Sequence, residues 1–200
     1  MIIEFQNQLK AYSFPESIED TEGYLEKYWL QEQEYLSKWK EVQASIFNLD
    51  VEFPKMIVNP EFRLLPRQGG LLFEQEEFEL LKECIKEAKD KSLFVIEDYN
   101  ELCPPHESGP LLRFKYPVDL KWSEINIGDG ISYELFQRPV RNYFVFGDSG
   151  KWGKYVANDF DIPIDIYCFK KGLELVFKER FNVIDEEDRE LKELIPEYYK

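Results

Sequence analysis

Residues 141–159 read RNYFVFGDSGKWGKYVAND and predict a β-hairpin near the centre of a sheet. The first arm, from Tyr143 to Phe146, is a continuous apolar run that is typical of a buried strand. A Gly-Asp-Ser-Gly turn follows, and the second arm carries Trp152 and Tyr155, which we expect to pack across the sheet. No other stretch of the chain has so distinctive a pattern.

The segments on either side of the hairpin predict an α+β fold. Amphipathic helices are expected over residues 17–43, 74–91 and 185–194, and strands over residues 62–65, 92–98, 111–116, 131–136, 164–169 and 173–177. Consecutive strands without alternating helices indicate a largely antiparallel sheet with the helices packed on it. We expect one domain over residues 1–200, in which residues 1–70 form an N-terminal amphipathic helix and a proline-rich joint and residues 71–200 form the α+β core.

The chain is strongly acidic. Its 40 Asp and Glu residues outnumber its 25 Lys and Arg residues, which gives a formal net charge of -15. A field of this sign repels phosphate backbones, so nucleic acid is not expected as a direct ligand, and it favours a basic protein partner. The same charge also serves solubility, because a negative surface keeps protein molecules apart. Composition alone leaves both interpretations open.

The cysteine and histidine content indicates a reducing compartment and argues against zinc. Cys84, Cys103 and Cys168 are far apart and odd in number, which is unlike a disulfide framework. His106 is the single histidine, so the chain lacks closely spaced zinc ligands. We expect no metal and no cofactor. The many carboxylates leave the binding of a hard cation as an alternative. The first residues lack a signal-peptide pattern and no apolar run has the length of a membrane span, so we expect a cytoplasmic protein without a membrane partner.

Two enzyme motifs are incomplete in the hairpin. Gly147 to Gly150 resembles the start of the nucleophile motif of trypsin-like serine proteases, but Lys151 stands where a glycine normally follows. A phosphate-binding loop requires a glycine five residues before Gly150 and a hydroxyl residue after Lys151, and Val145 and Trp152 occupy those places. We therefore predict no catalytic residues in this stretch.

Three groups of residues are candidates for function. The first is an aromatic and acidic patch for a protein partner, with a purely structural turn as the alternative. The second is an aromatic and carboxylate cleft for a small molecule or carbohydrate, as in an enzyme. The third is an N-terminal interaction module, with a contribution to the core as the alternative. They comprise Asp148, Trp152, Tyr155, Asn158 and Asp159 for the patch, Asp119, Trp122 and Asp129 for the cleft, and Trp29 and Trp39 for the module.

The order of these segments resembles the SUKH superfamily. The resemblance covers roughly residues 74–177 and depends on a Glu- and Leu-rich helix, an apolar strand at 143–146, the Gly147-Asp148 turn and an aromatic strand at 152–155. Many bacterial members are immunity proteins that neutralise toxins by binding them, so the resemblance implies no catalytic residues. We therefore expect a non-catalytic intracellular protein-binding domain, in particular an immunity protein that neutralises a basic toxin, and leave its oligomeric state open.

Overall fold

The computed structural model describes residues 21–51, 55, 57–69, 72–98, 112–125, 142–157 and 164–181. These include both arms of the predicted hairpin. The helix predicted over 185–194 and the strand predicted over 131–136 lie outside the described residues, and so do Cys103, His106, Asp129, Asn158 and Asp159.

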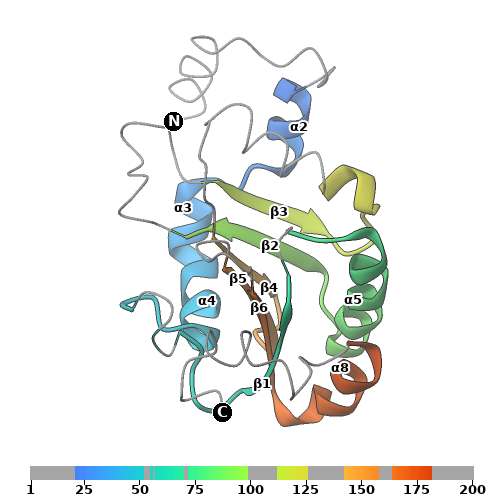
Figure 1. The fold of residues 1–200 in the computed structure, drawn as a ribbon. Coiled ribbons are helices and arrows are strands. Elements are labelled where there is room, and N and C mark those ends of the chain that lie inside the picture. Colours follow the sequence, from blue (N-terminus) through green and yellow to red (C-terminus); the bar gives the residue numbers. More distant parts are fainter. Residues whose placement is uncertain are drawn as a thin grey trace.

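The described residues form a six-stranded sheet in the order β1-β6-β5-β4-β2-β3, and all neighbouring strands are antiparallel (Figure 1). Helices pack on this sheet, so the predicted α+β fold with a largely antiparallel sheet is confirmed. The segment predicted as a proline-rich joint contributes the edge strand β1, which pairs with β6 along its whole length. The strands are β1 (Arg63–Gln68), β2 (Ser92–Glu97), β3 (Arg113–Pro117), β4 (Tyr143–Gly147), β5 (Trp152–Ala157) and β6 (Ile164–Phe169).

The predicted hairpin is confirmed and lies in the middle of the sheet. Its arms β4 and β5 are antiparallel neighbours, with Phe144 opposite Tyr155 and Phe146 opposite Gly153. Gly150 in the turn has a φ of 63°, a left-handed conformation that glycine adopts without strain.

The helix predicted over 17–43 is divided in the structure. Its helical pieces are α2 (Thr21–Tyr28), α3 (Glu32–Glu34), the π-helical turn η1 (Tyr35–Trp39) and α4 (Lys40–Ile46). Between α2 and α3, Trp29 forms an antiparallel bridge with Phe114, and the Leu30 N–H donates to the Arg113 carbonyl oxygen at 2.8 Å. The edge strand β3 thus binds main-chain groups that would otherwise continue the helix.

The strand predicted over residues 173–177 is wrong, because this segment is helical. A 3-10 turn, η2 (Lys171–Leu173), leads directly into α8 (Glu174–Arg180). Leu173 and Phe177 are buried four residues apart, whereas Leu175 is 71% exposed. Burial of residues i and i+4 is the helical pattern. The sequence alone is ambiguous, because apolar residues at 173, 175 and 177 also fit the alternation of a strand. In addition, β6 already has β1 and β5 as neighbours, so a strand that follows β6 finds no free edge beside it.

The sheet has an apolar core on each face, with helices outside both (Figure 1). The predicted helix α5 (Gln75–Ala88) is confirmed and covers one face together with α8, while α4 covers the other. Side chains alternate between the faces, so β4 contributes Tyr143 and Val145 to the core under α5 and Phe144 and Phe146 to the core under α4. Every position of β4 is therefore buried.

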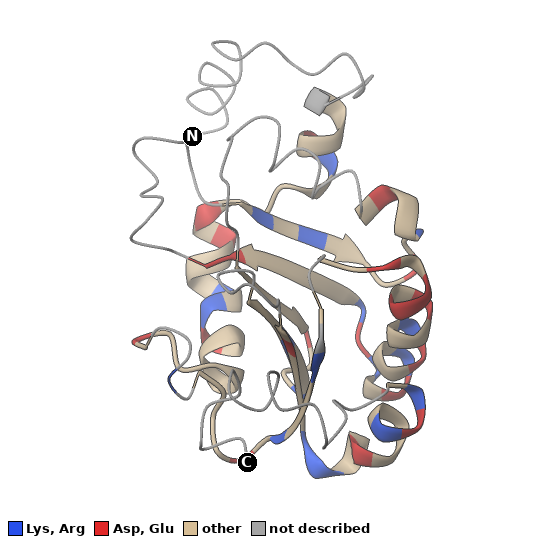
Figure 2. Cartoon of the chain, in the orientation of Figure 1, with Lys and Arg blue, Asp and Glu red and all other residues tan. Residues whose placement is uncertain are grey.

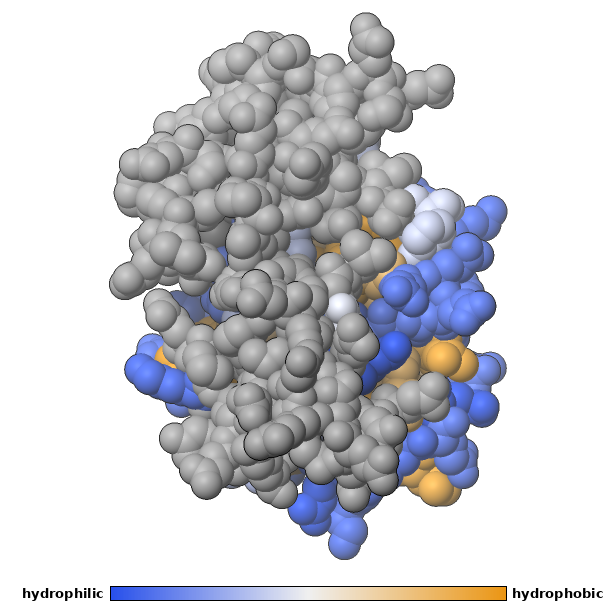
Figure 3. Space-filling model, viewed as in Figure 1, coloured by the Kyte–Doolittle hydropathy of each residue, from blue (hydrophilic) through white to orange (hydrophobic). Residues whose placement is uncertain are grey.

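The outer surface of α5 and α8 is polar. In the view of Figure 3 this region is mostly hydrophilic, and Figure 2 shows Lys, Arg, Asp and Glu residues along both helices. Among the helices of the described ranges, none combines the length and the apolar character needed to cross a lipid bilayer.

Candidate functional site

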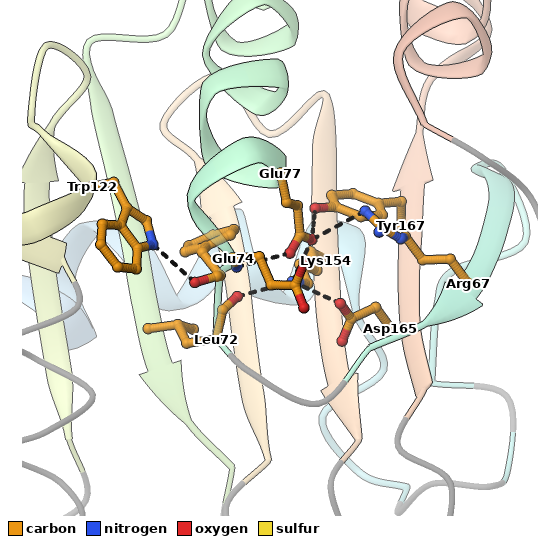
Figure 4. Close-up of polar contacts among 9 residues, drawn as sticks. Arg67, Leu72, Glu74, Glu77, Trp122, Lys154, Asp165 and Tyr167 are labelled. Carbon is orange, nitrogen blue, oxygen red and sulfur yellow. Dashed lines mark hydrogen bonds and ion pairs between the residues drawn. The ribbon is translucent and has the colours of Figure 1, made fainter.

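Lys154 lies at the centre of a buried group of charged side chains between β5 and α5 (Figure 4). It points to the same face as Trp152 and its side chain is 0% exposed. Its ammonium donates to Glu77 Oε1 at 2.7 Å and to the Leu72 carbonyl oxygen at 2.8 Å, and it lies 2.8 Å from Asp165 Oδ2. The three protons of the ammonium thus have three acceptors, which offsets the cost of burying the charge. We call the group of Lys154, Glu77, Asp165, Arg67 and Tyr167 the Lys154 cluster.

Glu77 is a carboxylate that the Lys154 cluster keeps ionised. It is the third residue of α5, where it also accepts from the Glu74 N–H at 3.3 Å in a capping box. Burial is the largest influence on this carboxyl and raises its pKa, but Lys154, the donating Tyr167 hydroxyl and Arg67 at 3.6 Å together outweigh burial. The pKa of Glu77 therefore lies below its ordinary value.

Asp165 is the member of the cluster whose negative charge is less well supported. The residue is 1% exposed, and its Oδ2 contacts Lys154 while its Oδ1 has no hydrogen-bond partner in the described part of the chain. Burial raises the pKa of this carboxyl to about 6 against the opposing charge of Lys154, and the charge of Glu77 adds to the rise. Gly69 packs so closely on the carboxylate that a Cβ there would overlap it, so a glycine allows the chain to close over Asp165.

Trp122, predicted to line a cleft, holds the segment that leads into α5. Its indole N–H donates to the Phe73 carbonyl oxygen at 3.0 Å, and its half-buried ring packs against the core. The adjacent Leu72 carbonyl accepts from Lys154, so two side chains hold consecutive carbonyl groups (Figure 4). Of the other two predicted cleft residues, Asp119 is exposed in the turn after β3, and Asp129 lies outside the described residues. Trp122 therefore has a structural contact that the cleft prediction did not include.

The hairpin turn is hydrogen-bonded to the two residues Asp90 and Lys91, which follow α5. Asp90 accepts hydrogen bonds from the Ser149 N–H and from the Trp152 indole N–H, both at 2.6 Å. Asp148 in turn accepts from the Lys91 N–H at 2.8 Å. Burial raises the pKa of Asp90, the donors from Ser149 and Trp152 oppose that rise, and Asp148 adds to it. These contacts agree with the alternative that the Gly-Asp-Ser-Gly turn is structural.

The partner patch predicted at the hairpin is corrected by the structure, because its aromatic members are buried. Trp152 and Tyr155 are both fully buried and lie on opposite faces of β5, the first in the core under α5 and the second in the core under α4. Side chains three residues apart on a strand point to opposite faces, because successive side chains alternate between the two faces. Asp148 is half-buried in the turn, and Asn158 and Asp159 lie outside the described residues. The two aromatic rings are therefore core residues and not a contact surface.

The tryptophans of the predicted N-terminal module pack on the sheet of their own chain. The rings of Trp29 and Phe114 meet edge to face with centroids 5.9 Å apart, and those of Trp39 and Phe94 lie 4.5 Å apart. The Trp39 indole N–H also donates to Glu34 Oε1 at 2.9 Å. Both tryptophans are half-buried, which favours the interpretation that they belong to the core.

The described thiols are unsuited to nucleophilic chemistry. Cys84 on α5 and Cys168 on β6 are free and buried. Burial raises the pKa of Cys84 to about 12 and also raises the pKa of Cys168, whereas the thiolate is the reactive form of cysteine. Within the described ranges, no group of three or more His, Cys, Asp or Glu side chains is arranged to hold a metal ion.

The residues that organise these contacts were missed by sequence reasoning. Lys154, Asp165 and Asp90 were not predicted as important, although each is a charged residue that is buried in the structure. A signal was present for two of them, because Lys154 and Asp165 stand within strands that are otherwise apolar. Asp90 lies two residues after the end of α5, inside the range predicted as a helix, and its sequence context gives no comparable signal.

Comparisons with known proteins gave no match. No protein-family model matches the chain, no curated protein matches it, and no solved structure matches it. The resemblance to the SUKH superfamily therefore stays a prediction, and any function is argued from the residues of this chain.

Proposed function

We propose that this chain is a non-catalytic, cytoplasmic protein-binding domain whose acidic surface contacts a basic protein. In the particular form that the SUKH resemblance suggests, the partner is a basic toxin and the chain is an immunity protein. The formal net charge of -15 supports a partner of opposite sign, because complementary charge speeds association and discriminates against other partners.

The observation that carries the proposal is a row of glutamates on the outer side of α5. Glu76, Glu79, Glu83 and Glu87 follow one another at steps of three and four residues, and all four are exposed. Arg180 of α8 lies 2.7 Å from Glu83, the third of these four residues. An exposed ion pair of this kind contributes at most about 1 kcal/mol, so a basic partner can compete for it at little cost. We call these four residues the glutamate row.

The position of the other charged groups supports binding over catalysis. Lys154, Glu77 and Asp165 are buried and face one another, so they are unable to meet a molecule in solution without a rearrangement. Cys84 and Cys168 are likewise buried. Charge on the outer surface is thus the chemistry that the described residues offer to another molecule.

Affinity capture followed by measured binding tests the proposal. The chain is used to capture proteins from a lysate of the organism that encodes it, and each basic protein found is purified for isothermal titration calorimetry. The test variant carries Glu76→Gln, Glu83→Gln and Glu87→Gln. The control variant carries Glu41→Gln, Asp50→Asn and Glu61→Gln, which are exposed positions outside α5 and α8. Both variants have a net charge of -12, since three negative charges are removed from -15.

We expect the glutamate-row variant to bind roughly tenfold more weakly than the wild type at low salt, because its loss of charge lies at the contact. The control should stay within about twofold of the wild type, and binding of the wild type should weaken as salt rises from about 50 to about 300 mM. Equal weakening in both variants would contradict a specific role of the glutamate row. Failure to find any basic protein that binds saturably would contradict the proposed function itself.

A further inference from the structure

Only one of the two carboxylate oxygens of Asp165 has a polar partner among the described residues. Its Oδ2 lies 2.8 Å from the Lys154 ammonium, whereas its Oδ1 has no hydrogen-bond partner among the described residues. A buried carboxylate oxygen without a donor is costly, because the charge that it shares has lost its hydration. A proton on that oxygen removes the cost.

We propose that Asp165 is a proton-binding site of this fold, which takes up a proton on Oδ1 in mildly acidic solution while Oδ2 keeps its contact with Lys154. The proton comes from the solvent, and no covalent bond other than the O–H bond forms. The site is built by the sheet and α5 together, since its neighbours come from four different elements.

Each element packed around Asp165 contributes one titratable or charged group. Lys154 comes from β5, Tyr167 from β6 itself, Glu77 from α5, and Arg67 from β1, where it is directly opposite Asp165 in the strand register. With all four ionisable charges present, two cations and two anions balance one another. Proton uptake at Asp165 leaves one net positive charge, which the exposed side of Arg67 can share with water.

The direction of the effect on stability follows from burial. Burial raises the pKa of Asp165 to about 6, compared with an ordinary value of 3.8. The folded protein therefore binds this proton more tightly than the unfolded chain does, so Asp165 contributes stability that is fully present below about pH 4 and is lost as the pH rises through about 6. Glu77 has the opposite sign, because its lowered pKa contributes stability that is lost on acidification.

The direct test is a carbon-13 NMR titration of the Asp165 side-chain carboxyl in the wild-type protein. Through-bond spectra link each carboxyl carbon to the assigned β carbon of its own residue, so no variant is needed for assignment. We expect a titration midpoint above pH 5, more than about one unit above the value of about 3.9 that is usual for aspartate. A midpoint below pH 5, or a carboxyl that stays ionised down to that pH, overturns the proposal.

A second measurement uses Asp165→Asn, which resembles the protonated carboxyl in shape. The ratio of the unfolding equilibrium constants of wild type and variant should change roughly 20-fold between about pH 4.5 and about pH 7, with the wild type relatively more stable at the lower pH. Asp50→Asn, an exposed substitution, is the matched control, and its ratio should not change in this range. A flat ratio for Asp165→Asn contradicts the proposal even if the NMR signal moves.

Discussion

The substitution Lys154→Met removes the ammonium at the centre of the Lys154 cluster and keeps an unbranched side chain. Glu77 and Asp165 are then buried without the cation that lies 2.7 Å and 2.8 Å from them. Removal of one partner from a buried ion pair costs about 3–5 kcal/mol, because the remaining charge is uncompensated. We expect a loss in this range, which is a large part of the typical free energy of unfolding of about 5–15 kcal/mol.

Urea unfolding at about pH 7.5 measures this loss. At that pH Asp165 is ionised in the folded protein, since its pKa is about 6. With a slope of about 2–3 kcal/mol per molar urea, the midpoint should fall by roughly 1.5 M. Lys178→Met is the matched control, because Lys178 forms an exposed ion pair with Glu174 at 2.7 Å, and its loss should cost less than about 1 kcal/mol.

A double substitution separates the unpaired charge from the loss of packing. Lys154→Met combined with Asp165→Asn leaves neither the ammonium nor the carboxylate of this pair. The double variant should lose less free energy of unfolding than the two single variants lose in total. The reason is that the Asp165 carboxylate, which Lys154→Met alone leaves unpaired, is then absent. The reasoning is refuted if the two losses add in full, or if Lys154→Met costs no more than Lys178→Met.

Two other features yield further expectations. Phe177→Ala should destabilise the protein by about 3–5 kcal/mol and Leu175→Ala by less than about 0.5 kcal/mol, because α8 buries the first side chain and exposes the second. Equal losses in urea unfolding would indicate a strand, in which both side chains share a face. In native Cys103→Ser protein, the thiols of Cys84 and Cys168 should react with a dithionitrobenzoate reagent at less than about one hundredth of their unfolded rate. Rapid reaction of either native thiol would disprove its burial.

The elements that the sequence predicted well are those whose patterns allow one structure. The apolar runs that became β2 and β4 indicated buried strands, and helices do cover both faces of the sheet. For α5, the apolar spacing, the acidic first turn and the basic last turn all agree.

The two errors in secondary structure have non-local causes. The letters of residues 173–177 fit a strand and a helix equally, and the helix forms because β1 and β5 already occupy both sides of β6. The helix predicted over 17–43 is interrupted because the edge of β3 binds the main chain at Leu30. Neither cause is visible within the segment concerned, since both depend on which strand has a free edge.

The Lys154 cluster shows what further information a sequence would need. Lys154 shares a face of β5 with Trp152 and Val156, and a lone charge at such a position is ordinary when that face meets solvent. Once helices are known to cover both faces, the same position requires a buried counter-charge. The strand register then places Asp165 opposite Val156, diagonal to Lys154, and the first turn of α5 brings Glu77 from above the sheet. Lys154 therefore needs an ion-pair partner only because helices cover both faces of the sheet. The sequence of β5 alone does not contain that information.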